Sequence, residues 1–317
     1  MKRLYDWEID AEAILFLPGV IPGLAMGCKA VGTAGHNVVV QPPVYAPFFN
    51  VAKGQQLDLN FAPLTLNDNG DFLHYEIDFD VLTQAYNEDT DLFILCNPHN
   101  PVGRVWTRDE LTQMAQIALD NDAIIVSDEI HCDLLFDDYK HIPIASLSPE
   151  IEKQTITLMA PSKTFNMPGL GAAFAIVPDK DLREKFQAAL WTIGAHAFTM
   201  GLVGTKAAYE HGDTWLKEAL AYMQMNRDYV VDYLKRELPS IKTTCPEGTY
   251  LMWLDCNAYD FGDKKPADYL AENARVALND GAWFGEGGQG FLRLNLACPR
   301  SVLEQALNRI RDTLKTV

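Results

Sequence analysis

Short apolar runs without polar alternation recur through the first 177 residues of the chain. They cover residues 37–41, 92–96, 123–127, 155–159 and 172–177 and are rich in Val, Ile, Leu and Phe. Strands that are buried on both faces of a parallel sheet have this continuous pattern, because neither face meets water. The five runs therefore predict the strands of one sheet.

The segment between the second and third runs has the period of an amphipathic helix. Thr107 and Glu110 have the spacing of a capping box. Apolar residues recur on one face of this helix at Leu111, Met114, Ala115 and Ala118. A strand, a helix and a strand in this order form a parallel crossover unit. The sequence thus predicts an α/β fold in three layers, with helices on both faces of a mainly parallel sheet.

From residue 213 the pattern changes to longer helices and isolated strands. The elements predicted there are helices at 213–238 and 265–280, strands at 249–256 and 290–298, and a last helix that Ser301 and Glu304 open with a second capping box. This order is α+β in character, and 317 residues provide for about two domains. We predict a larger domain, 1–212, and a smaller C-terminal domain, 213–317.

Charge and cysteine placement argue against several classes of protein. The chain carries 26 Lys and Arg against 43 Asp and Glu, a net charge of −17, and such a surface repels nucleic-acid phosphates. The six cysteines are scattered without a C-x-x-C pair. We therefore expect reduced thiols and no metal site.

The N-terminal stretch lacks the pattern of a secretion signal or of a membrane span. Two basic residues are followed at once by Asp6, Glu8, Asp10 and Glu12, whereas a signal peptide continues with an apolar region. Pro and Gly then interrupt the next apolar stretch, so it is too short to cross a bilayer. The sequence predicts a cytoplasmic protein with no membrane partner.

Polar side chains follow three of the predicted strands at the point where each strand ends. They are Asn100 after 92–96, Asp128 and His131 after 123–127, and Lys163 after 155–159. Because ligands bind beyond the carboxyl ends of strands in open parallel sheets, these side chains are expected at one binding edge. An amide, a carboxylate, an imidazole and an amine would meet there.

Each of these residues also has a purely structural interpretation. Asn100 precedes a proline and suits a turn, and Asp128 suits a helix or loop cap. His131 can be a core histidine, and Lys163 can be a solvated loop charge, as most lysines are. Only their joint placement favours a functional site.

Pyridoxal phosphate (PLP) chemistry requires this combination of groups. The cofactor needs a lysine for a Schiff base and an acid against its pyridine nitrogen, which makes the ring an electron sink. It also needs donors to the ring hydroxyl, an aromatic face, and backbone N–H groups at a helix start for its phosphate. The chain offers a candidate for each need: Lys163, Asp128, Asn100 with His131, Tyr45, and the turn at 18–23.

At this point the chain resembles a known family, the fold-type I PLP enzymes of aminotransferase class I/II, and within it the MalY/PatB-type C–S lyase (cystathionine β-lyase) branch. The matching stretches are FLPGVIPGL, PPVYAPF, CNPHNPVGRVWTRDEL, VSDEIHCDL, HIPIASL, PSKTFNMPGL and RLNLACPR. Their order and spacing extend over essentially the whole chain. The resemblance implies an aspartate-aminotransferase-like fold in which the larger domain, 1–212, binds PLP.

The resemblance also implies a role for each residue at the strand ends. Lys163 would hold the cofactor and, once freed by substrate, move the α-proton. Asp128 would pair with the pyridinium nitrogen and Asn100 with the ring hydroxyl. His131 stands where many relatives carry Tyr and would also contact the ring hydroxyl, and Tyr45 would stack on the ring.

The phosphate and the substrate would be held by other segments. The resemblance assigns the phosphate to the N–H groups of Val20 and Ile21 and to Ser162, and the substrate α-carboxylate to Arg293. A guanidinium suits a carboxylate because it donates two parallel hydrogen bonds. Arg293 could instead form a surface ion pair on an edge strand. Ala160 stands where relatives often place a phosphate-binding Ser, so one phosphate bond would be lost.

The implied activity is α,β-elimination from cysteine S-conjugates such as cystathionine, which gives a thiol, pyruvate and ammonia. An aminotransferase would use the same residues and stays open as an alternative. Full-length relatives have an additional N-terminal segment, so a shortened form that is inactive or regulatory but still binds PLP is a second alternative. The resemblance further implies a homodimer acting on a small amino-acid substrate.

Overall fold

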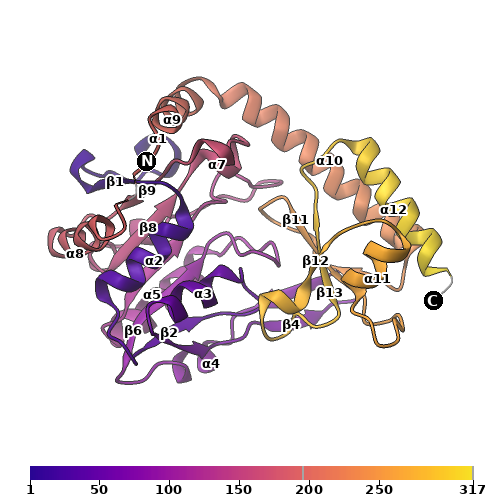
Figure 1. The fold of residues 1–317 in the computed structure, drawn as a ribbon, viewed down its shortest axis with the longest axis horizontal. Helices are drawn as coiled ribbons and strands as arrows, with labels where there is room; N and C mark the ends of the chain where they lie inside the picture. Colours follow the sequence, from indigo (N-terminus) through magenta and orange to yellow (C-terminus); the bar gives the residue numbers. More distant parts are fainter. Residues whose placement is uncertain (195, 316–317) are drawn as a thin grey trace.

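The computed structural model describes residues 1–194 and 196–315. A seven-stranded sheet forms the middle layer of the larger part of the molecule, on the left in Figure 1, in the order β1-β9-β8-β7-β6-β2-β3. Its strands are β1 (Ile14–Leu17), β2 (Asn37–Val40), β3 (Asp58–Phe61), β6 (Thr90–Cys96), β7 (Ile124–Asp128), β8 (Thr155–Met159) and β9 (Ala173–Ile176). The five strands predicted for this sheet are confirmed to within two residues at each end.

The strands from β3 to β8 in this order pair in parallel, while β9 pairs antiparallel with both β8 and β1. Every residue of β8 is buried, as are the last five of β6. Burial on both faces explains why these strands are continuous apolar runs. The mainly parallel sheet is confirmed, with its last run turned antiparallel.

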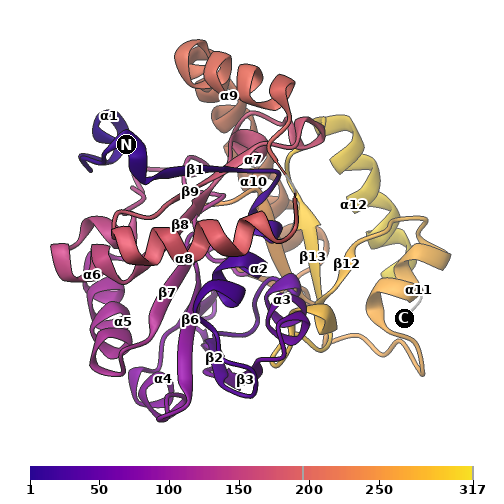
Figure 2. The ribbon, with the colours of Figure 1, turned by 60° about the vertical axis from the view of Figure 1, so that its left-hand side comes forward.

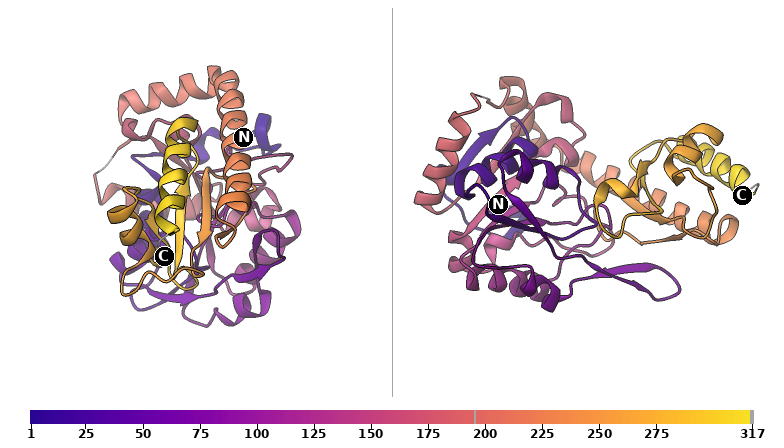
Figure 3. Two further views of the ribbon diagram at one scale, coloured as in Figure 1. Left: turned by 90° about the vertical axis from the view of Figure 1, so that its right-hand side faces the viewer. Right: turned by 60° about the horizontal axis from the view of Figure 1, so that its bottom comes forward.

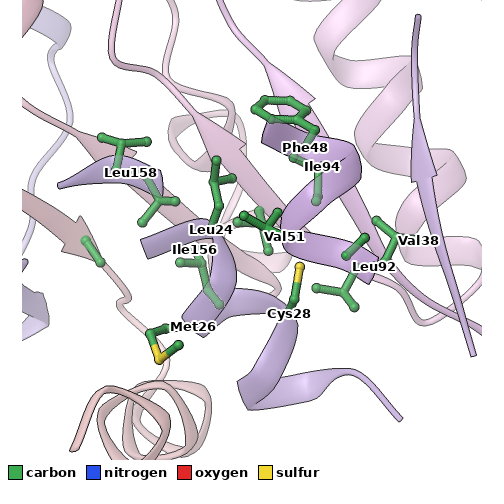
Figure 4. Close-up of a cluster of buried hydrophobic side chains, with 14 of the residues drawn as sticks. Leu24, Met26, Cys28, Val38, Phe48, Val51, Leu92, Ile94, Ile156 and Leu158 are labelled. Atoms are coloured by element: carbon green, nitrogen blue, oxygen red, sulfur yellow. The ribbon is translucent and has the colours of Figure 1, made fainter. Parts of the chain in front are cut away.

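Helices cover both faces of this sheet, as the three-layer prediction requires. One face is packed by α2 (Val20–Val31), α3 (Pro47–Gly54) and α8 (Lys180–Trp191), which Figure 2 shows in front of the strands. Leu24, Met26 and Cys28 of α2 lie among Ile156, Leu158 and other strand residues in the buried cluster of Figure 4. At about 25 cal/mol per Å² of buried apolar surface, clusters of this kind supply most of the free energy that favours folding.

The other face is covered by α4 (Phe79–Gln84), α5 (Arg108–Asp120) and α6 (Pro149–Lys153). The capping box predicted for α5 is present: Thr107 Oγ1 accepts from the Glu110 N–H at 3.3 Å, and the Glu110 carboxylate accepts from the Thr107 N–H at 2.7 Å. The predicted apolar face of α5, from Leu111 to Ala118, is buried.

The chain also forms short elements around the large sheet. They are α1 (Lys2–Tyr5), η1 (Ala11–Ala13), β4 (Thr65–Asp68), β5 (Leu73–Glu76), η2 (Ile144–Ser146), α7 (Pro161–Thr164), η3 (Pro168–Leu170) and α9 (Thr199–His211). β4 and β5 form a hairpin that extends toward the C-terminal part of the chain (Figure 3, right). Asp68 in this hairpin forms an ion pair with Lys242.

The C-terminal part has a sheet of its own, in the order β10-β11-β13-β12 (Figures 1 and 3). Its elements are α10 (Asp213–Glu237), β10 (Lys242–Thr243), β11 (Leu251–Asp255), α11 (Pro266–Asn273), β12 (Asn279–Asp280), η4 (Gly281–Phe284), β13 (Phe291–Asn295) and α12 (Arg300–Leu314). A separate apolar cluster joins α10, α11 and α12 to this sheet. The smaller α+β unit is thereby confirmed, while the boundary between 1–212 and 213–317 stays a prediction.

Two predictions for the C-terminal part were wrong. The helix predicted at 265–280 ends at Asn273, because Arg275 takes a left-handed backbone conformation (φ 55°) and the chain then forms β12. Ser301 does not cap the last helix. The cap is Pro299 and the helix begins at Arg300, two residues earlier than a cap at Ser301 would start it, and the N–H of Arg300 donates to the hydroxyl of Tyr222 on α10 at 2.7 Å.

Candidate active site

A cavity of about 340 Å³ lies where the carboxyl ends of the parallel strands face the C-terminal sheet. Its lining includes residues from both: Gly19, Val20, Ile21, Pro22, Tyr45, Cys96, Asn100, Asp128, Ile130, His131, Lys163, Tyr250, Leu251, Asn279, Arg293 and Asn295. Of the predicted site residues, all but Ser162 line this cavity. The large sheet therefore brings together residues from Gly19 to Lys163, which are about 140 positions apart in the sequence.

Asp128 is the last residue of β7, between Cys96 of β6 and Leu158 of β8. Only 4% of its surface is exposed, and burial raises the pKa of its carboxyl group to about 7. One carboxylate oxygen accepts from the N–H of Ile130 at 3.1 Å. Within residues 1–194 and 196–315, no basic side chain forms an ion pair with it, so a cation bound in the cavity would find an unpaired acid.

His131 lies one turn beyond Asp128 and is also buried. Its ring packs edge-on against Tyr250 at 5.8 Å between centroids. Burial, together with the positive charges of Lys163 and Arg293, lowers the pKa of His131 to about 3. The imidazole is therefore neutral near pH 7 and has one donor and one acceptor nitrogen.

Lys163 lies in the single turn of α7, directly after β8, and is half-buried. The next residue, Thr164, is buried and donates from Oγ1 to Asp133 at 2.9 Å, which holds this turn against the large sheet. Lys163 is consequently not a solvated loop charge. Its amine belongs to the cavity wall.

Arg293 comes from β13, which is flanked on both sides by β11 and β12 rather than lying at an edge. Its two terminal nitrogens donate to side-chain oxygens of Asn100 at 2.9 Å and Asn279 at 2.8 Å. The guanidinium carbon lies 4.8 Å from the ring centroid of Phe284. The interpretation of Arg293 as an edge-strand surface residue was therefore wrong.

The Nε atom of Arg293 is buried and has no hydrogen-bond partner among the described residues. Burial also lowers the pKa of this guanidinium. An unsatisfied buried donor on a cation is costly, and an anionic oxygen in the cavity would satisfy it. Since Asn100 accepts with its oxygen, its amide nitrogen remains available to donate.

The N-terminus of α2 forms another side of the cavity. Gly19 precedes the helix, and the N–H groups of its first turn, including those of Val20 and Ile21, have no carbonyl within the helix to bind. Such a turn is suited to a phosphate group. Tyr45, whose ring packs edge-on against Phe48 at 6.2 Å, lines the cavity from the segment before α3.

Several lining residues escaped the sequence analysis. Asn295 lies two positions after Arg293 on the same strand. Because side chains on a strand alternate between its faces, this spacing was a signal that could have found Asn295. Asn279 is the cross-strand neighbour of Arg293, and Tyr250 lies immediately before β11. No sequence signal indicated the pairing of Asn279. Ser162 lines a second, neighbouring cavity instead.

Over the described part of the chain, no group of three or more His, Cys, Asp or Glu residues is arranged to hold a metal ion. All six cysteines are free thiols. None of the described helices is long and apolar enough to span a membrane.

Comparison with known proteins identifies the family. Residues 1–310 match the model of the aminotransferase class I and II family, and the chain belongs to this family. It is 39% identical over 316 residues to the cystathionine β-lyase PatB of Bacillus subtilis (strain 168), a match that covers 99% of this chain and 81% of PatB.

Two solved structures have the same fold over nearly the whole chain. Cystalysin from Treponema denticola, which contains PLP, matches with a TM-score of 0.96 and 34% identity, over 100% of this chain and 80% of that one. The PLP-bound C–S lyase from Staphylococcus hominis matches with a TM-score of 0.93 and 32% identity, over 99% and 79%. The predicted family, fold type and cofactor are confirmed at the level of this family.

The residues of the cavity fit PLP. One space of suitable size is lined by a buried acid that has no ion-pair partner among the described residues, a helix N-terminus, an aromatic ring and a lysine. These are the groups that a protonated ring nitrogen, a phosphate, a ring face and an aldehyde require.

Proposed function

We propose that this protein is a PLP-dependent C–S lyase that cleaves cysteine S-conjugates by α,β-elimination. The proposal rests mainly on the observation that Lys163, Asp128 and Arg293 line one cavity. This set binds an α-amino acid beside a lysine amine. Elimination rather than another PLP reaction is supported by the similarity to proteins described as cystathionine β-lyase and C–S lyase.

In this proposal the large sheet holds the cofactor. Asp128 faces its ring nitrogen, Asn100 donates to its ring hydroxyl with the amide nitrogen, and Tyr45 lies on the ring. The neutral imidazole of His131 adds a second contact at the hydroxyl.

The phosphate and the substrate are bound at opposite ends. The N–H groups of Val20 and Ile21 bind the phosphate. Ser162 lines the neighbouring cavity, and its role as a phosphate ligand rests on the family resemblance alone. Arg293 binds the substrate α-carboxylate, and its unpartnered Nε gains the missing acceptor.

When bound, PLP supplies an electron sink for the negative charge left on the substrate α-carbon. Lys163 removes the α-proton with its amine. The β-carbon–sulfur bond then breaks, and sulfur keeps the bonding electron pair and takes a proton to become a thiol. The remaining aminoacrylate takes up water and gives pyruvate and ammonia, so that one conjugate and one water yield one thiol, one pyruvate and one ammonia.

Purified protein supplied with PLP and a cysteine S-conjugate tests this proposal. We expect thiol and pyruvate in equal amounts, and we expect borohydride to attach the cofactor to the peptide that contains Lys163. Amino transfer to a keto acid without thiol release would show an aminotransferase. A protein that binds PLP but turns over neither kind of substrate would show the inactive or regulatory alternative.

We also propose a homodimer. Large apolar side chains gather in and around α8 and α9 and are 42–69% exposed: Trp191, Ile193, Phe198, Met200 and Val203. Exposed apolar patches of this kind mark interaction sites, and a second copy of the chain would cover them. Sedimentation should give a dimer that Met200→Asp with Val203→Asp converts to monomer, whereas a monomeric starting protein would contradict this.

A further inference from the structure

A second cavity, of about 360 Å³, lies on the other side of Lys163. Its lining comes from the α7 turn and the segment after it, from α10, and from the segment after β13: Ser162, Lys163, Thr164, Asn166, Pro168, Trp215, Ala219, Tyr222, Met223, Tyr250, Asn295, Ala297, Cys298 and Pro299. Three of these residues, Lys163, Tyr250 and Asn295, also line the first cavity. The two spaces therefore adjoin at the lysine.

Aromatic and apolar groups form most of the wall on the α10 side. Trp215 is 47% and Tyr222 is 41% exposed, although both are large rings. The Trp215 ring is 6.2 Å from that of Phe165, and the Tyr222 hydroxyl accepts from the N–H of Arg300 at 2.7 Å. Both rings thus have fixed neighbours and still present surface to the cavity.

The two cavities differ in the charged side chains that line them. The first is lined by Asp128, Lys163 and Arg293, whereas among the described residues that line the second only Lys163 is charged. Arg300 lies close by but is not among the lining residues, and two of its guanidinium nitrogens point elsewhere: Nε donates to Asn226 at 2.9 Å and a terminal nitrogen donates to the Met225 carbonyl at 2.6 Å. Apart from Lys163, which the proposed reaction uses, the described lining of the second cavity offers no cation to a carboxylate, and it offers no acid to an ammonium group.

We propose that this second cavity binds the arm of the substrate that is attached to sulfur. It favours uncharged apolar arms, such as benzyl or alkyl groups, over the charged homocysteine arm of cystathionine. The inference rests on the proposed function. Arg293 holds the α-carboxylate in the first cavity, and Lys163 takes the proton from the neighbouring carbon. The sulfur is two bonds beyond that carbon, and we place the arm in the second cavity because this space adjoins the first at Lys163.

Physical chemistry sets the direction of the preference. An apolar arm gains from leaving water and from contact with the indole and phenol rings. The homocysteine arm would bring a carboxylate and an ammonium group against a wall whose one charged side chain, Lys163, is engaged in the proposed proton transfer. Unpaired buried charges are costly. A site discriminates most strongly against a group that it cannot satisfy.

The decisive experiment compares kcat/KM for S-benzyl-L-cysteine, S-methyl-L-cysteine and cystathionine, measured as pyruvate. We expect the benzyl conjugate to exceed cystathionine by about tenfold or more. Trp215→Ala should lower the ratio of benzyl to methyl conjugate about tenfold. The matched control is Trp283→Ala, since Trp283 is 57% exposed and is not among the residues that line either cavity.

A gain-of-function variant tests the charge argument. Ala219→Arg places a cation on the α10 wall, at a helix position that accepts arginine. It should raise the ratio of cystathionine to benzyl conjugate about tenfold. An unchanged ratio in both Trp215→Ala and Ala219→Arg would overturn the inference.

A binding measurement separates this inference from the proposed function. Lys163→Ala protein supplied with PLP is titrated calorimetrically with S-benzyl-L-cysteine, with and without Trp215→Ala. Weaker binding on loss of Trp215 supports the second cavity even if no conjugate gives pyruvate, an outcome that would refute the lyase proposal alone. Equal binding in the two proteins would refute the cavity assignment.

Discussion

The two walls of the first cavity are built in different ways. The wall from the large sheet takes Asp128 from the end of β7 and Lys163 from the α7 turn after β8, and the backbone ladder joins these two parallel strands with Asp128 opposite Leu158. The wall from the C-terminal sheet takes Arg293 from β13 and orients it by side-chain contacts with Asn100, Asn279 and Phe284. The first wall is therefore held mainly by the backbone, with one side-chain hydrogen bond from Thr164 to Asp133 at the Lys163 turn, and the second is held by side chains. The same kind of substitution should have different consequences on each.

The largest effect on turnover is expected from a substitution of Lys163, the reacting amine on the large-sheet wall. Lys163→Ala removes the group that moves the α-proton, and we expect turnover to fall about a thousandfold or more. The fold should be unaffected because the side chain is only half-buried. Pyruvate formation and circular dichroism check the two parts. Substantial residual turnover would show that another group moves the proton.

The next effect is electrostatic. Asp128→Asn keeps the shape of the wall but removes its anion, and loss of one partner of a buried charge pair costs about 3–5 kcal/mol. We expect PLP affinity to fall about a hundredfold or more, measured by fluorescence titration of the cofactor. Glu12→Gln, an exposed acid outside the cavity, is the control.

Asp128 also gives the protein without cofactor a distinctive dependence on pH. Its folded pKa of about 7 lies above the value of 3.8 for a free Asp. Between these pH values the unfolded chain has lost the proton that the folded chain still holds, so the free energy of unfolding falls as pH rises through this range. Asp128→Asn should flatten that fall in urea titrations at pH 5 and pH 8. Equal slopes in the two proteins would mean that the carboxyl group is not desolvated.

On the C-terminal wall, Arg293→Lys should raise KM about tenfold to a hundredfold. Lysine keeps the charge but cannot donate to Asn100, Asn279 and a substrate carboxylate in one plane. Initial rates over a range of substrate concentrations measure the change. A normal KM in this variant would place the carboxylate elsewhere.

The smallest effect tests whether side chains orient this wall. Asn279→Ala removes one hydrogen bond to the guanidinium, worth about 1.5 kcal/mol, so KM should rise about tenfold while kcat changes little. Asn67→Ala on the β4–β5 hairpin, whose amide binds Glu76, is the matched control. If both variants behave alike, Arg293 does not depend on its neighbours for orientation.

The same difference between the walls explains which residues could be predicted. The strands before Asn100, Asp128 and Lys163 are short apolar runs, and the rule that ligands bind at the carboxyl ends of parallel strands placed the three residues together. Arg293 was assigned only through the family resemblance. Its contact with Asn100 joins residues 193 positions apart, and no local pattern encodes such a pair.

The errors have equally local causes. The apolar pattern continues past Asn273, but Val276 is buried against the C-terminal core without being helical. Hydrophobic periodicity reports burial, and burial is shared by helix and loop. Likewise, Ser301 with Glu304 has the capping spacing, yet the helix begins two residues earlier, with its cap at Pro299, where the N–H of Arg300 binds the hydroxyl of the distant Tyr222.

The sequence by itself determined the strands of the large sheet, the cap of α5, the family, and the residues at the strand ends, because each depends on residue types at short spacing. Tertiary structure alone decided the orientation of Arg293, the burial of Asp128 without an ion-pair partner among the described residues, and the second cavity beside Lys163. These features depend on which distant surfaces meet and on how far water is excluded between them. Local spacing carries no information about either.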